Sequence, residues 1–173
     1  MCIRDRLPRL LREIPNARLV VIGRYHRRQP YVRKVRKFLN ENGLHRITRW
    51  TGLRYNIPDF LAAMDVCVVP SLEEPLGLVA IESQASGTPV VASRTGGLCE
   101  VVEDGVTGLL VPPKDPDAIA DAILKIHADE KLRRKVVYRG KQQYQAKFAT
   151  DFLASQVEGV YQKMLSRKKR MAA

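Results

Sequence analysis

The sequence predicts an α/β fold in which a parallel sheet carries helices on both faces. Short apolar runs bounded by turn residues alternate with longer segments of helical periodicity, a pattern typical of βαβ units. The 173 residues, 45% hydrophobic and 28% charged, suit an ordinary globular protein with one core. We therefore expect one α/β domain.

The elements follow in order. L-P-R-L-L-R-E-I-P at 7–15 is typical of the end of a helix, and the apolar run A-R-L-V-V-I-G predicts the first strand. Asp115 followed by Pro116 is a strong helix start, because aspartate caps the free amides and proline suits the first turn. The expected strands are 17–23, 46–51, 65–69, 89–92 and 107–111, and the expected helices are 30–41, 57–64, 78–86, 116–128, 129–146 and 150–165.

The stretch from Pro70 to Ser93 is the most informative for function. Glu74 and Glu82 stand eight positions apart, separated by a turn and the start of an apolar helix at Leu78. Gly77 lets the backbone approach a ligand, and the free amides of the helix start favour a phosphate or diphosphate. Carboxylates repel a diphosphate but accept hydrogen bonds from hydroxyls. This layout indicates a site for a nucleotide-sugar.

The predicted topology places this stretch beside other loops. Ligands bind outside the carboxyl ends of strands in open parallel sheets, and four segments follow predicted strands. Helix 78–86 has apolar residues on most sides, so we expect it to be buried together with Glu82. The four segments are Gly23, 52–54, 71–77 and 93–97.

The spacing of Glu74 and Glu82 resembles the glutamate-x7-glutamate motif of retaining GT-B glycosyltransferases, most closely family 4 (glycosyl transferases group 1). Three further blocks follow that family's pattern in register: G-T-P-V-V-A-S at 87–93, T-G-G-L-C-E-V-V-E-D-G-V-T-G-L-L-V-P-P at 95–113 and D-P-D-A-I-A-D-A-I at 115–123. The resemblance covers residues 7 to 165. It implies a Rossmann-like domain, the C-terminal half of a GT-B fold, at residues 7–149.

The resemblance also implies roles for residues. Glu74 is the expected catalytic residue, in contact with hydroxyls of the donor sugar, and Glu82 is expected to bind the ribose. The reaction implied is transfer of a sugar from a UDP- or GDP-linked donor to a hydroxyl acceptor with retention, without a metal or cofactor. The remaining expected donor-binding residues are Gly77, Leu78 and Val79 at the diphosphate, Gly23, Arg54 near the nucleobase, and Gly96 and Gly97.

Two of these positions keep alternatives open. Gly96-Gly97 either forms only a tight turn or brings its loop to the donor. The family often has a second glycine two positions after the one equivalent to Gly23, whereas this chain has Tyr25.

Asp115-Pro116-Asp117 spells the metal motif of a different glycosyltransferase fold, but here the two acids open a helix, so we interpret them as capping residues.

The resemblance predicts an incomplete domain. M-C-I-R-D-R at 1–6 resembles a translated sequencing adapter and is expected to be non-native. The family's first strand, an Arg/Lys loop and the N-terminal acceptor domain are expected upstream, so the chain alone is expected to be inactive. Helix 150–165 is expected to cross onto the acceptor domain, leaving its apolar face partly uncovered, and 166–173 is a basic tail.

Charge is distributed unevenly. The net charge is +12; residues 1–50 hold fourteen Lys/Arg against three Asp/Glu, residues 51–130 four against thirteen, and residues 131–173 twelve against two. Nucleic acid is disfavoured, because no aromatic residues are interleaved with the charges. Solvated helix faces are the simplest interpretation, and contact between the 166–170 tail and anionic lipid is the second.

The cysteines and the lengths of the apolar runs argue against a metal-binding protein and against a membrane-spanning protein. Cys67 lies in a predicted strand and is expected to pack as an apolar residue, and Cys99 has no partner at metal-ligand spacing. No apolar run is long enough to span a membrane, so the expected location is the cytoplasm, with peripheral contact at the inner membrane face as an option.

Alternatives to a glycosyltransferase remain open at this point. One is a non-catalytic module that binds a nucleotide-sugar, and another is a basic protein that binds RNA or membranes. Related enzymes, a sugar phosphorylase or an NDP-sugar epimerase, fit the block at 70–93 less well.

Overall fold

The computed structural model describes residues 6–24 and 29–171, with side chains described as far as residue 166. It confirms the α/β fold, and every expected strand is present. Residues 1–5, most of the segment expected to be non-native, lie outside the described residues. The strands are β1 (Leu19–Ile22), β2 (Thr48–Gly52), β3 (Cys67–Val69), β4 (Val90–Ser93) and β5 (Leu109–Val111).

Helices connect the strands, as βαβ units require. Helices α2, α4 and α6 have the bounds predicted from the sequence, whereas α5 and the 3-10 turn η2 were not predicted. The helical elements are α1 (Leu7–Glu13), α2 (Pro30–Glu41), η2 (Leu44–Arg46), α3 (Ile57–Ala62), α4 (Leu78–Ser86), α5 (Leu98–Val101), α6 (Pro116–Ala128), α7 (Glu130–Lys147) and α8 (Thr150–Met171).

The strands pair in two groups. β1 pairs with β2, and β4 lies between β3 and β5; all of these pairs are parallel. Among the described residues, β1 and β3 do not pair with each other or with a further strand on their second edge. All four β1 residues are half-buried, whereas all four β4 residues are buried.

Two apolar cores lie on opposite faces of β4. Val91 packs into a core with Leu39 of α2, Ile119 of α6 and Leu10 of α1. Val90 and Ala92 point the other way, because strand side chains alternate, into a core formed with α3, α4 and α5. Helices therefore cover both faces, as predicted. This double burial explains why β4 is a continuous apolar run.

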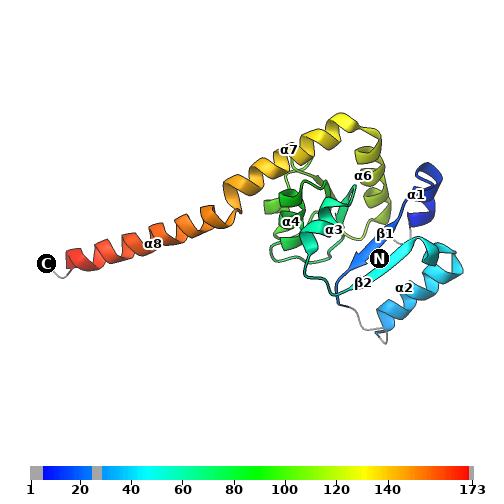
Figure 1. Cartoon of the computed structure of the whole chain (residues 1–173), viewed down its shortest axis with the longest axis horizontal. Helices are drawn as coiled ribbons and strands as arrows, with labels where there is room; N and C mark the ends of the chain where they lie inside the picture. Colours follow the sequence, from blue (N-terminus) through cyan, green and yellow to red (C-terminus); the bar gives the residue numbers. More distant parts are fainter. Residues whose placement is uncertain (1–5, 25–28, 172–173) are drawn as a thin grey trace.

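The two ends of the chain differ in their attachment. α1 lies against α6, where Arg6 pairs with Asp117 at 2.6 Å and Arg9 pairs with Asp121. α8 instead projects from the domain as a long helix (Figure 1). It continues to Met171, six residues beyond the expected end, so the backbone of the expected basic tail is largely helical.

Exposed apolar side chains run along α8. The spacing of three and four residues places them on one face of the helix. The stripe consists of Leu153, Val157, Val160, Tyr161, Met164 and Leu165, each between 48% and 64% exposed. The apolar face expected to be partly uncovered, which also includes Phe152 at 38% exposed, is therefore confirmed. Within the described residues, no helix is both long enough and apolar enough to cross a membrane.

Capping explains Asp115, as predicted. Its side chain accepts a hydrogen bond of 2.9 Å from the amide of Ala118 at the start of α6. We expect Asp115→Ala to lower the free energy of unfolding by about 1 kcal/mol, because one amide at the helix start loses its acceptor. Urea denaturation measures this change. Asp115→Asn should retain most of the stability, and equal losses for both variants would contradict capping.

Candidate functional site

Glu74 lies in the loop between β3 and α4, at the carboxyl end of β3. Its side chain is half-buried, and its two carboxylate oxygens have different partners. The hydroxyl of Ser71 donates to Oε2 at 3.0 Å, and the amide of Gly77 donates to Oε1 at 3.2 Å. The carboxylate is therefore held within its own loop rather than extended into solvent.

Gly77 begins α4 with a left-handed backbone, φ +90°, that suits glycine. A Cβ at this position would lie 2.6 Å from Cδ2 of Leu98, so the site also excludes side chains for lack of space. The first helical bond is donated by Ala80 to the Gly77 carbonyl. The amides of Leu78 and Val79 therefore precede the hydrogen-bonded turns, where a helix attracts anions.

The expectation that helix 78–86 is buried was wrong for one of its faces. Leu78 is 63% exposed, Val79 is 47% exposed, and Glu82 is exposed as well. Only the opposite face packs inward, through Ala80, Ile81, Ser83 and Gln84. Because residues four apart share a helix face, Glu82 lies over Leu78, and its side chain leans toward the helix start. The exposed face thus combines a carboxylate, two apolar side chains and the helix N-terminus.

Gly96 and Gly97 bring a second loop against Glu74. The amide of Gly97 donates to the Glu74 carbonyl at 2.8 Å. A Cβ at Gly96 would lie 2.2 Å from that same carbonyl oxygen, and a Cβ at Gly97 would lie 2.3 Å from the carbonyl oxygen of Pro75. These glycines do more than form a turn, because only residues without a side chain let the two backbones approach so closely.

Sequence reasoning missed two side chains at this junction. Ser71 bonds the Glu74 carboxylate, and the hydroxyl of Thr95 donates to the Leu72 carbonyl at 3.1 Å. The available signal was the three-residue spacing of Ser71 and Glu74, the reach of a local side-chain hydrogen bond.

Gly23 and Arg54 follow the paired strands β1 and β2. The amide of Gly23 donates to the Gly52 carbonyl at 3.0 Å, which extends the strand pairing one residue beyond the end of β1. Arg54 is exposed, and its guanidinium carbon lies 5.9 Å from the centre of the Phe60 ring. The structure therefore places Arg54 on a neighbouring ring, whereas Gly77, Gly96 and Gly97 each lie against Glu74.

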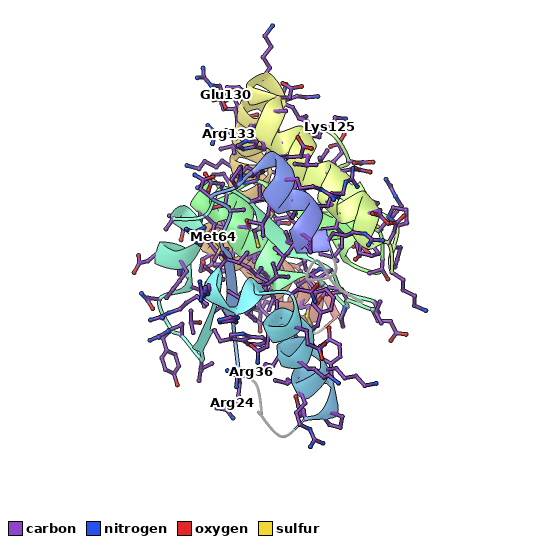
Figure 2. All side chains as sticks on the ribbon, turned by 90° about the vertical axis from the view of Figure 1, so that its right-hand side faces the viewer. Arg24, Arg36, Met64, Lys125, Glu130 and Arg133 are labelled. Atoms are coloured by element: carbon purple, nitrogen blue, oxygen red, sulfur yellow. The ribbon has the colours of Figure 1, made fainter. Side chains whose placement is uncertain are left out.

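A surface hollow lies elsewhere and does not involve these residues. It measures about 450 Å³ and is lined by Met64, Glu130 and Arg133, among others. Hydrogen bonds from Arg133 and Arg134 lower the pKa of the exposed Glu130 to about 2. Figure 2 shows Arg24, which follows β1, at the end of the molecule opposite Glu130 and Arg133. The hollow is therefore lined by the ion pairs of Glu130 with Arg133 and Arg134, and it is separate from the Glu74 loop.

Cys67 packs as an apolar residue, as expected. Cys67 is buried in β3, and burial raises the pKa of its thiol. Cys99 is exposed on α5. In the described part of the chain, no three His, Cys, Asp or Glu residues gather as metal ligands would.

Comparison with known proteins identifies the family. The model of the family "Glycosyl transferases group 1" matches residues 5–143. The chain belongs to this family. The D-inositol 3-phosphate glycosyltransferase of Xylanimonas cellulosilytica is 36% identical over 167 residues, which cover 95% of this chain and 40% of that protein. The chain thus spans less than half the length of this relative.

Solved structures place this group 1 chain in the GT-B fold. Sucrose-phosphate synthase from Thermosynechococcus elongatus is similar with a TM-score of 0.82 at 35% identity, over 95% of this chain and 42% of that one. Anabaena Alr3699/HepE, solved in complex with UDP, is similar in fold with a TM-score of 0.80 at 24% identity, over 91% and 45% of the two chains.

The close approach at Gly97 leads to a stability prediction. We expect Gly97→Ala to lower the free energy of unfolding by about 1–3 kcal/mol, because the added Cβ forces the Pro75 carbonyl away. Chemical denaturation with circular dichroism measures the loss. Gly159→Ala in α8 is the control: a Cβ there meets nothing within 4 Å, so this change should be neutral or stabilising. A Gly97→Ala chain as stable as this control would contradict the packing argument.

Proposed function

We propose that this chain carries the nucleotide-sugar site of a retaining glycosyltransferase that moves a sugar from an NDP-linked donor to a hydroxyl acceptor. The observation that carries the proposal is the convergence at the start of α4. Glu74 is fixed beside Gly77, and Glu82 lies on the same exposed helix face as Leu78 and Val79. Membership in the glycosyl transferases group 1 family supports the reaction class. The UDP complex of the Anabaena protein supports a nucleotide ligand.

Each part of the donor has a matching group in this arrangement. The diphosphate faces the backbone at 77–79 through the amides of Leu78 and Val79, where the helix dipole stabilises negative charge. Glu82 accepts hydrogen bonds from the ribose hydroxyls, and Glu74 accepts them from the sugar. Leu78 and Val79, exposed in this chain, supply apolar contact between these polar ends. Gly23, Gly96 and Gly97 allow close backbone approach, and Arg54 borders the base.

In the proposed reaction, the bond between the anomeric carbon and the diphosphate oxygen breaks. The acceptor oxygen bonds to the same face of that carbon, and its proton passes to the departing diphosphate oxygen. Negative charge grows on the leaving diphosphate, so the helix N-terminus stabilises the transition state more strongly than it stabilises the bound donor. Glu74 holds the sugar while this charge develops. The proposed donor is UDP- or GDP-linked, and no cofactor takes part.

For the whole protein, the proposal also includes an acceptor domain and a further strand that completes the sheet. A parallel strand from another part of that protein would pair with the second edges of β1 and β3, and the upstream Arg/Lys loop would face the diphosphate. The apolar stripe of α8, defined above by Leu153 to Leu165, would pack on the acceptor domain. We also propose that the basic residues 166–170 contact an anionic membrane.

Calorimetric titration of the chain with UDP, GDP and ADP tests the site. We expect saturable binding of one of these nucleotides and at least a tenfold loss of affinity in Glu82→Ala, because hydrogen bonds to a charged group contribute about 1.5–3 kcal/mol. Glu73→Ala is the matched control, since it removes an equal charge from an exposed neighbouring position.

Three results would contradict this proposal. They are equal losses in Glu82→Ala and Glu73→Ala, equal affinity for all three nucleotides, and absence of binding by a chain that circular dichroism shows to be folded. Strongly salt-dependent binding to RNA, unchanged in Glu82→Ala, would favour the alternative of a basic binding protein.

A second experiment tests whether the apolar stripe of α8 lies outside the core of this domain. We expect Leu153→Glu with Val157→Glu to leave the melting temperature of the domain within about 2 °C, because these side chains are exposed and contribute little to its core. Ile126→Ala, at a fully buried position of α6, should lower the melting temperature strongly. A melting temperature lowered as much by the α8 pair would show that the stripe belongs to the domain's own core.

A further inference from the structure

Three hydrogen bonds hold Glu74 in place. Its backbone carbonyl accepts from the Gly97 amide at 2.8 Å, which fixes the main chain. Its carboxylate accepts once at each oxygen, from Gly77 at 3.2 Å and from Ser71 at 3.0 Å. The contact to Ser71 is the only one of the three made by another side chain, so it is the one that a substitution can remove without altering the backbone.

Chemistry determines the direction of the Ser71 bond. An ionised carboxylate can only accept hydrogen bonds, so the serine hydroxyl must be the donor, and its single hydrogen points to Oε2 of Glu74. The carboxylate has about four lone-pair sites, and two are occupied in this loop. The other two remain for hydroxyl donors from a ligand.

Ser71 is well placed to hold this geometry. It lies two residues after β3, whose Cys67 and Val69 are buried, and it is itself half-buried. The start of the loop is therefore anchored in the core, while Gly77 anchors its end at α4. A carboxylate held between two anchored points keeps one orientation, whereas a single amide contact leaves the torsions of a glutamate side chain free.

We propose that Ser71 is a positioning residue: its hydroxyl orients the Glu74 carboxylate toward the sugar of the bound donor. The inference rests on the proposed function and deepens it. Because Glu82 and the helix start serve the nucleotide, Ser71 affects recognition of the sugar and leaves the affinity for the free nucleotide unchanged. Its effect acts entirely through Glu74.

The experiment compares UDP with UDP-glucose by calorimetry, and GDP with GDP-mannose as a second pair. The measured quantity is the ratio of the dissociation constant of the nucleotide to that of its sugar conjugate. We expect Ser71→Ala to lower this ratio about tenfold, the value of one hydrogen bond to a charged group, with the nucleotide's own dissociation constant unchanged. Ser71→Thr retains a hydroxyl and should restore most of the ratio.

A double-mutant cycle separates positioning from a structural role. In a Glu74→Ala background, Ser71→Ala should have no additional effect on the ratio, since the group it orients is gone. Thermal unfolding of each variant checks that the loop change does not unfold the domain. A purely structural role would weaken nucleotide and conjugate binding alike.

The outcomes distinguish the two proposals. If the wild-type chain binds UDP in a Glu82-dependent manner but Ser71→Ala leaves the ratio intact, the positioning role is overturned and the proposed function stands. An effect of Ser71→Ala that persists without Glu74, or a wild-type chain that binds neither sugar conjugate more tightly than its nucleotide, also overturns the positioning role. If the folded wild-type chain binds no nucleotide, both proposals fail.

Discussion

Burial of β4 on both faces is the constraint on which the rest of this domain depends. Val90 and Val91 are fully buried, and they point into two different cores. Because each face needs its own helices, α6 lies on one side of the strand and α3, α4 and α5 lie on the other. The parallel pairing of β4 with β3 and β5 then aligns the carboxyl ends of all three strands.

The candidate site follows from that alignment. The loops after β3 and β4 leave the sheet at the same edge, and the amide of Gly97 joins them through the Glu74 carbonyl. Gly96 and Gly97 allow a backbone contact that any side chain would prevent. The carboxylate of Glu74, the proposed sugar-binding group, is therefore held by the fold's own hydrogen bonds, an arrangement that reduces the entropy that binding must overcome.

The lobe formed by β1, β2 and α2 is attached differently. Its apolar residues join the same core as Val91, yet its strands pair only with each other among the described residues. Its surface is strongly basic: Arg33, Lys34 and Lys37 are exposed on α2, and Arg36 lies 5.8 Å from the centre of the Trp50 ring. The basic charge of residues 30–41 is thus carried on the exposed side of α2.

The fold class, the strands and the position of the loop that carries Glu74 could all be predicted from the amino-acid sequence. Hydrophobic periodicity and the Asp115 cap are local signals, so α6 could be predicted to the residue from them. The sequence did not reveal which face of α4 is exposed, because an all-round apolar pattern looks buried until the packing partners are known. Only tertiary structure decided that Leu78, Val79 and Glu82 face outward. It also decided that Ser71 and Gly97 hold Glu74, since contacts between separate loops depend on how strands pair and leave no periodic signal in the chain.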